Sequence, residues 1–187
     1  MSLRAFNGNS IILNQMISHI FLVGFMGSGK STIGKILAQE LSYTFIDLDS
    51  YIESSQQHSI SELFAKHGEQ GFRTIEKNSL HELKSFQNVV IACGGGTPCF
   101  FDNMEWMKST GRVIFLHCTP ESLFHRLKSE QAHRPLIRDF EPDMLQQYIA
   151  KKLEERMPYY TLADIQVFEM NDKMKIARYS LDALQVI

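Results

Sequence analysis

One segment constrains the fold of this chain more than any other, because the loop that it encodes must follow a strand and open a helix. The segment is Gly24-Phe25-Met26-Gly27-Ser28-Gly29-Lys30-Ser31-Thr32, which fits the pattern G-x-x-x-x-G-K-[ST] of a phosphate-binding loop. Residues 20–23 before it form an apolar run, which predicts a buried parallel strand. Apolar residues then recur at helical spacing, at Ile33, Ile36, Leu37 and Leu41.

The residue types of this loop predict its chemistry. Glycines allow the backbone to curl so that successive N–H groups point at one anion, and a helix N-terminus adds partial positive charge. Lys30 supplies a mobile cation for the terminal phosphates of a nucleotide, and Ser31 supplies a hydroxyl ligand for Mg²⁺. We therefore expect MgATP to bind at residues 24–32.

Composition limits the class of protein and the kinds of partner. The chain has 187 residues, of which 44% are hydrophobic and 21% charged, and its formal net charge is −2. These values suit one domain with a sizeable core and lack the basic excess of a nucleic-acid-binding protein. The longest apolar runs have the length of strands, so neither a transmembrane helix nor a membrane partner is expected. Cys93, Cys99 and Cys118 lack a C-x-x-C spacing and are typical of reduced thiols in a cytoplasmic protein.

The chain divides into an N-terminal extension at residues 1–18, part of which could derive from cloning, and a single domain at residues 19–187. Strand and helix patterns alternate along the domain, as in a parallel α/β sheet. The strands are expected at residues 19–24, 44–47, 89–92, 112–117 and 165–169. The helices are expected at residues 30–41, 49–57, 59–66, 70–84, 101–109, 120–128, 143–157 and 173–184.

Three local patterns refine these expectations. Ser59-x-x-Glu62 is a capping box that opens a helix. Pro158 is expected to end the helix before it. Residues 129–142 form a polar, proline-punctuated loop of a length that usually has a function, and we interpret them as a lid.

Two carboxylates stand at the end of the predicted strand 44–47, where ligands of an open parallel sheet bind. Asp47 is the best candidate for the magnesium shell, because the strands at 89–92 and 112–117 do not end in an acid. Asp49 can serve a second partner, such as a substrate. The alternative for Asp49 is the N-cap of the following helix.

Glycines and arginines complete the candidate residues. Gly94-Gly95-Gly96 follows a predicted strand and offers a backbone surface that a small ligand can approach closely, although it could also be a simple sharp turn. Arg73 and Arg156 could be ordinary surface arginines or could bind a carboxylate through their planar forks. Arg134 lies in the predicted lid, where a cation can close over phosphates or remain solvated.

Taken together, these segments resemble the shikimate kinase family from residue 19 onward. The matching motifs are the loop at 24–34, Asp47-Leu48-Asp49, Gly68-Glu69-x-x-Phe72-Arg73-x-x-Glu76, Gly94-Gly95-Gly96, Arg134-Pro135-Leu136 and Arg156-x-Pro158-x-Tyr160. Gluconate and adenylate kinases share the first motif but not the set. The resemblance implies a nucleoside-monophosphate-kinase-like fold with a five-stranded parallel sheet in the order 2-3-1-4-5. It also implies phosphorylation of the 3-hydroxyl of shikimate in aromatic amino-acid biosynthesis.

The resemblance assigns roles residue by residue. Asp49 would hold shikimate hydroxyls and could act as a base, while Lys30 and Arg134 would stabilise the transferring phosphoryl group. The implied ATP-binding residues are Gly27, Ser28, Gly29, Lys30, Ser31, Thr32 and Arg134. The implied shikimate-binding residues are Asp49, Arg73, Gly95, Gly96 and Arg156, with the two arginines on the carboxylate. The implied magnesium residues are Ser31 and Asp47.

Two other functions stay open at this point. One is a kinase for another small polyol acid such as gluconate. The other is a nucleotide-binding module without catalysis, against which the intact Lys30, Ser31, Asp49 and Arg134 argue. For the kinase, we expect a cytoplasmic monomer whose partner is a small-molecule substrate and neither a nucleic acid nor a membrane.

Overall fold

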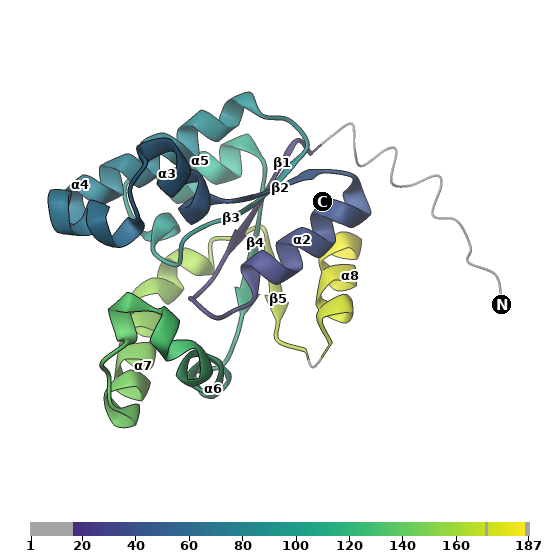
Figure 1. Ribbon diagram of the computed structural model, residues 1–187. Coiled ribbons are helices and arrows are strands. Elements are labelled where there is room, and N and C mark those ends of the chain that lie inside the picture. The colour runs from purple at the N-terminus through teal and green to yellow at the C-terminus, as the bar shows by residue number, and fades with distance from the viewer. Residues whose placement is uncertain (1–16, 171, 186–187) are drawn as a thin grey trace.

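A parallel sheet places the phosphate-binding loop near the middle of the molecule. The computed structural model describes residues 17–170 and 172–185. The strands are β1 (His19–Val23), β2 (Thr44–Asp47), β3 (Val89–Ala92), β4 (Arg112–His117) and β5 (Ile165–Phe168). They form a five-stranded, all-parallel sheet in the order β2-β3-β1-β4-β5 (Figure 1). The order 2-3-1-4-5 that the resemblance implied is confirmed.

Helices cover both faces of this sheet, because most residues of its central strands are apolar and buried. Their bounds are α2 (Lys30–Leu41), α3 (Leu48–Gln56), α4 (Ile60–Glu82), α5 (Asn103–Thr110), α6 (Pro120–Glu130), α7 (Pro142–Tyr160) and α8 (Lys173–Leu184). Short 3₁₀ turns are η1 (Leu83–Ser85), η2 (Thr97–Cys99), η3 (Gln131–His133) and η4 (Pro135–Ile137).

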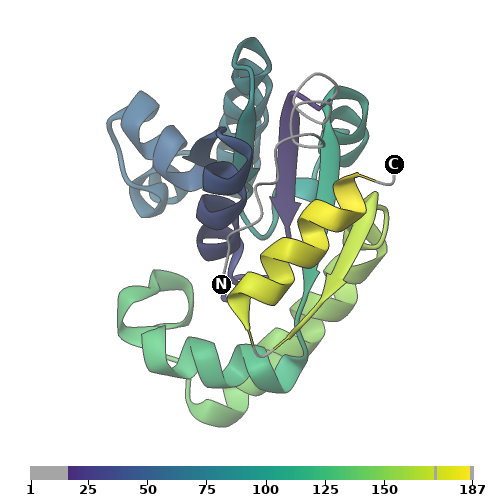
Figure 2. The same cartoon turned by 90° about the vertical axis from the view of Figure 1, so that its right-hand side faces the viewer.

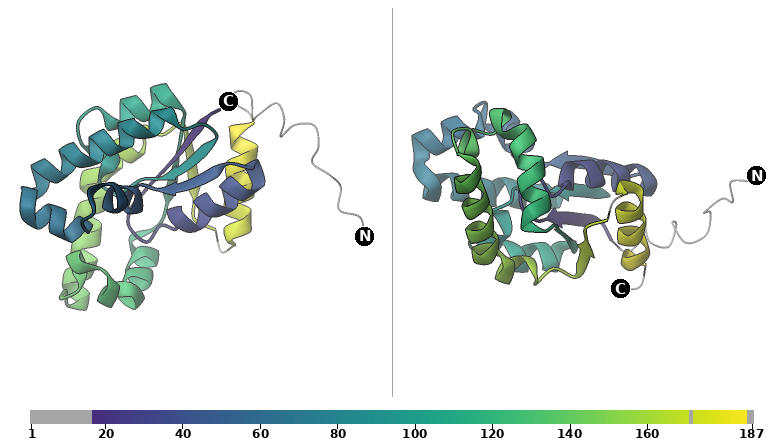
Figure 3. Two further views of the ribbon diagram at one scale, coloured as in Figure 1. Left: turned by 45° about the horizontal axis from the view of Figure 1, so that its top comes forward. Right: turned by 90° about the horizontal axis from the view of Figure 1, so that it is seen from below.

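The two faces of the sheet carry separate hydrophobic clusters. Successive strand residues point to opposite faces, so Phe21 and Val23 of β1 pack in one cluster and Ile20 and Leu22 in the other. The cluster of Ile20 and Leu22 contains residues of α2 and α8, which lie together on one side (Figures 2 and 3). Residues of α3 to α7 pack in the first cluster. A rigid scaffold therefore holds the carboxyl ends of the strands.

The expected break between the helices at 59–66 and 70–84 occurs within α4. Gly68 has a φ of 67° and a ψ of −178°, which departs from helical geometry. The capping box is also present, since the Ser59 backbone N–H donates to the Glu62 carboxylate at 2.8 Å.

One expected helix end is wrong, and one alternative that the sequence left open for a helix start is excluded. The helix before Pro158 does not stop there, because α7 continues to Tyr160. Proline lacks only its own N–H, and the N–H of Thr161 still bonds the carbonyl of Met157 at 3.0 Å, so the last turn survives. Asp49 is not the N-cap of α3, since the carboxylate of Asp47 accepts the capping N–H of Ser50 at 3.4 Å.

Residues 129–142 are more regular than the polar loop that the sequence predicts. They contain the turns η3 and η4 beyond the carboxyl ends of the strands, between α6 and α7 (Figure 1). Ile137 is fully buried in the core. The amide of Gln131 donates to the carbonyls of Ile137 and Phe140 at 2.7 and 2.6 Å. Ile137 thus anchors this segment in the hydrophobic core.

The predicted division at residue 18 falls close to the start of the described structure. Ile17 is buried, and its carbonyl accepts the Tyr43 hydroxyl at 2.6 Å, so this residue packs with the domain. Residues 1–16 of the predicted extension lie outside the described residues. Among the helices that the structure describes, none is both long and apolar enough to cross a membrane.

Candidate active site

The phosphate-binding loop has the open backbone that its glycines predict. Gly24, Gly27 and Gly29 have φ values of 142°, 80° and 93°, a region that favours glycine. Gly29 is the N-cap of α2 and makes no side-chain cap hydrogen bond. The first N–H groups of α2 therefore remain available to an anion, together with the positive end of the helix dipole.

Lys30 reaches back over this loop. Its ammonium group donates to the carbonyls of Gly24 and Phe25 at 2.8 and 2.9 Å. The pKa of Lys30 is lowered to about 8; burial is the largest cause and Arg134 adds to it, while Asp49 and Asp47 oppose the shift. The amine is thus a cation at neutral pH that is held at the end of the loop.

Ser31 and Asp47 lie in direct contact. The Ser31 hydroxyl donates to the Asp47 carboxylate at 2.8 Å. These hard oxygen groups fit Mg²⁺, which usually takes one or two protein ligands and completes its shell with water and phosphate oxygens. Accordingly, the described residues contain no group of three or more His, Cys, Asp or Glu side chains that could hold a metal alone.

Asp49 lies in the first turn of α3, beside the loop. Its side chain is accessible to solvent, yet the surrounding protein raises its pKa to about 6. Desolvation by the protein atoms packed around the carboxylate is the largest cause, followed by the negative charges of Asp47 and Glu76, while Lys30 favours the ionised form. A carboxylate with a pKa near neutrality is suited to accept a proton.

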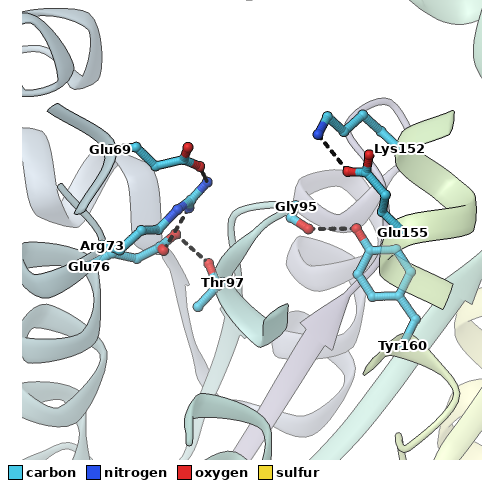
Figure 4. Close-up of polar contacts among 8 residues, drawn as sticks. All are labelled: Glu69, Arg73, Glu76, Gly95, Thr97, Lys152, Glu155 and Tyr160. Carbon is cyan, nitrogen blue, oxygen red and sulfur yellow. Dashed lines mark hydrogen bonds and ion pairs between the residues drawn. The ribbon is translucent and has the colours of Figure 1, made fainter. Parts of the chain in front are cut away.

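Arg73 is buried on α4 and points at the glycine segment after β3. Its Nη1 donates to Glu76 at 2.8 Å (Figure 4). Its guanidinium carbon lies 4.2 Å from the centre of the Phe100 ring. A Cβ added at Gly96 would stand 2.7 Å from Arg73 Nη2, so a side chain there would displace the guanidinium. The glycine is required for this close approach.

Arg156 approaches the neighbouring glycine from α7. A Cβ added at Gly95 would lie 3.2 Å from Arg156 Nη1. The Tyr160 hydroxyl donates to the Gly95 carbonyl at 2.5 Å and ties α7 to this segment (Figure 4). Burial raises the pKa of Tyr160, so the hydroxyl keeps its proton at neutral pH. Arg73 and Arg156 thus lie beside consecutive residues of the segment Gly94-Gly95-Gly96, which we call the glycine wall.

Arg134 lies in the turn region after α6 and forms an ion pair with Glu130. Its Nη2 and Nε donate to one oxygen of Glu130, at 2.5 and 3.2 Å. Because Glu130 is exposed, this pair contributes little to stability and can exchange for another anion.

One cavity of about 330 Å³ brings most of the predicted residues together. The predicted residues in its lining are Gly27, Gly29, Lys30, Ser31, Thr32, Asp47, Asp49, Gly95 and Arg134. The predicted residues outside its lining are Ser28, Arg73, Gly96 and Arg156. Of these, Arg156 lies beside Gly95, which lines the cavity, and Arg73 lies beside Gly96, the next residue. Another hollow, of about 490 Å³, is lined mainly by apolar atoms of β4, α6 and α7 and contains none of the predicted residues.

Sequence reasoning missed three polar residues of this region. Glu130 also lines the cavity, and its position four residues before Arg134 was the available signal. Glu76 stands three residues after Arg73, and this spacing on a helix was the available signal for their ion pair. Thr97 donates to Glu76 from a segment 21 residues away, and nothing local in the sequence indicates that contact.

Comparisons with known proteins point to one family. A family model described as shikimate kinase matches residues 26–185. A curated relative, the shikimate kinase of Bacteroides thetaiotaomicron, is 47% identical over 159 residues, which cover 84% of this chain and 91% of that relative.

Solved structures give the same result. A crystal structure of shikimate kinase from Bacteroides thetaiotaomicron matches with a TM-score of 0.85 at 44% identity, covering 91% of this chain and 99% of that one. Shikimate kinase from Acinetobacter baumannii, in complex with shikimate, matches with a TM-score of 0.84 at 33% identity. That match covers 95% of this chain and 97% of the other.

Proposed function

The chain belongs to the shikimate kinase family, and on this premise we propose that it transfers the γ-phosphoryl group of ATP to the 3-hydroxyl of shikimate. One observation carries the proposal beyond family membership. The phosphate-binding loop, a carboxylate of raised pKa and Gly95 line a single cavity, and two arginines lie beside Gly95 and Gly96. These groups suit a nucleotide, an attacking hydroxyl and a substrate carboxylate, respectively.

ATP would lie along residues 27–32 at the N-terminus of α2, where Lys30 and the free N–H groups meet its phosphates. Ser31 and Asp47 would hold Mg²⁺, whose charge offsets that of the phosphates. Arg134 would leave Glu130 for the phosphoryl group, because the exposed ion pair is weak.

Shikimate would place its carboxylate between Arg73 and Arg156, against Gly95 and Gly96. A buried carboxylate is costly to desolvate unless it receives charge-assisted hydrogen bonds, and two guanidinium groups supply them. Its hydroxyls would then face Asp49 across the cavity. The substrate is thereby oriented at both ends.

The chemical step follows from this placement. The 3-hydroxyl oxygen of shikimate forms a bond to the γ-phosphorus, and the bond from that phosphorus to the bridging oxygen of ADP breaks, leaving its electron pair on ADP. Asp49 accepts the hydroxyl proton. Lys30 and Arg134 stabilise the charge on the transferring group, which is the main contribution that a protein makes to phosphoryl transfer.

We also propose the cellular setting that fits such an enzyme. The chain would act in the cytoplasm as a monomer made of a single kinase domain at residues 19–187, with a small-molecule substrate and with no nucleic-acid or membrane partner. The net charge of −2 supports the absence of a nucleic-acid partner.

A coupled assay of ADP release tests the proposed function. With MgATP, we expect turnover with shikimate, none with gluconate, and formation of shikimate 3-phosphate by ³¹P NMR. The folded Lys30→Ala variant is the negative control and should nearly lose turnover. Turnover with gluconate alone would support the other kinase, and ATP binding without turnover would support a non-catalytic module.

A further inference from the structure

We propose that Thr97 is a positioning residue for the substrate-binding Arg73, on which it acts through the carboxylate of Glu76. The proposal rests on the function proposed above and adds a residue that the motifs do not assign. Thr97 is not among the residues that line the cavity. Its effect on the substrate must therefore pass through other side chains.

The contacts form a continuous chain (Figure 4). The Thr97 hydroxyl donates to Glu76 Oε1 at 2.6 Å. Arg73 Nη1 donates to Glu76 Oε2 at 2.8 Å. Each oxygen of the carboxylate thus has one donor, and the two donors come from different elements, η2 and α4.

Glu76 needs both donors, because only 1% of its surface is exposed. A buried carboxylate that loses a hydrogen-bond partner is poorly satisfied and turns toward whatever donor remains. Bonds to both of its oxygens fix the plane of the carboxylate and so fix the direction of the Arg73 fork. The other acid near Arg73, Glu69, lies 3.6 Å away and is mostly exposed, so it is a poor substitute.

Thr97 is itself held firmly. Its backbone N–H donates to the Gly94 carbonyl at 3.1 Å, and its own carbonyl accepts from the Asn103 amide at 2.8 Å. A Cβ added at Gly94 would stand 3.0 Å from the Thr97 hydroxyl and equally close to Glu76 Oε1 and Asp49 Oδ1. The hydroxyl therefore fixes Glu76 relative to the glycine wall, against which the substrate is proposed to lie.

The test compares substitutions at Thr97 in the full chain. Thr97→Val keeps the shape and removes the donor, while Thr97→Ser keeps the donor. We expect Thr97→Val to raise the Kd and KM for shikimate by roughly 10-fold or more, as for a lost hydrogen bond to a buried charged group. The KM for ATP should change by less than about 2-fold, and Thr97→Ser should restore shikimate affinity.

Thr74→Val is the matched control, since Thr74 is an exposed residue of α4 whose hydroxyl bonds only its own helix. It should leave both KM values unchanged. In an Arg73→Lys background, Thr97→Val should have little further effect on shikimate affinity, because the fork that it positions is absent. If Thr97→Val does not fold, Thr97→Ala carries the same expectation.

The outcomes are distinct. An unchanged shikimate Kd in folded Thr97→Val, or equal losses for ATP and shikimate, would overturn the positioning role and leave a purely structural contact. Wild-type protein without activity on shikimate would instead overturn the proposed function, which is measured first and separately.

Discussion

At the scale of single residues, burial moves the pKa values of Lys30 and Asp49 toward neutrality, to about 8 and about 6. The proposed mechanism needs the ionised form of each group. Asp49 loses its charge as the pH falls through about 6, and Lys30 loses its charge as the pH rises through about 8. Profiles of kcat/KM against pH should therefore be bell-shaped, with limbs near these values in the free enzyme.

The two limbs can be assigned separately. Bound phosphates favour the ammonium of Lys30, so the alkaline limb of kcat should lie at higher pH than that of kcat/KM. Folded Asp49→Asn should lose the acid limb and roughly 10²-fold or more of kcat. Steady-state rates over the whole pH range check both points, and an acid limb that persists in Asp49→Asn would identify a different base.

The arginine pair also makes a prediction at this scale. Lysine offers a point charge in place of a planar fork, so Arg73→Lys and Arg156→Lys should each weaken shikimate binding by roughly 2–5 kcal/mol. ATP affinity should change little, because neither arginine lies in the loop. Calorimetry with each ligand alone measures this, with the exposed Arg138→Lys as the control. Unchanged shikimate affinity in both variants would exclude the clamp.

At the scale of elements, the segment between α6 and α7 has one residue fixed in the core and one ion pair that can exchange partners. Ile137 is buried, whereas the pair of Arg134 with Glu130 is open to solvent. Arg134→Ala should lower kcat by roughly 10²-fold or more, with a smaller effect on shikimate binding.

Hydrogen exchange tests the motion itself. The amide of Phe140 bonds the carbonyl of Ile137 and should be protected without ligands. ATP and shikimate together should slow exchange in the turn that ends at Arg134. Fast exchange there with both ligands present would argue against a lid.

Elements were predictable where local signals agree. Strand ranges and the opening of α2 followed from apolar runs and glycines, while the sheet order came from the resemblance. The prediction that the helix ends at Pro158 was wrong, because a proline in a last turn removes one hydrogen bond without ending the helix. Ile137 stood in a polar segment, and one buried side chain in such a segment has no periodicity to reveal it.

At the scale of the whole molecule, the fold holds Asp49 at a cost to stability. Its pKa is higher in the folded state, about 6, than the ordinary value of 3.8, so folding disfavours its ionised form. The stability associated with the protonated group is present below the ordinary pKa and is lost as the pH rises through about 6. Asp49→Asn should therefore raise Tm at neutral pH while it lowers activity.

Thermal unfolding of wild type and Asp49→Asn at acid and neutral pH measures this directly. The difference in Tm should grow from low to neutral pH. A lower Tm for the variant at neutral pH would show that the carboxylate stabilises the fold. The choice of this residue for the site was possible from sequence, but its pKa was not, because its desolvation and the approach of Glu76 arise only in the tertiary structure.

The close packing of Arg73 on Gly96 bears on how an inhibitor of this enzyme could be evaded. A flat group seated against Gly95 and Gly96 would touch backbone where an added Cβ would crowd Arg156 and Arg73. Any side chain introduced at Gly96 to repel the drug would first push Arg73 from its place. Variants that resist such an inhibitor through a side chain at Gly96 should therefore lose affinity for shikimate before they lose affinity for the inhibitor.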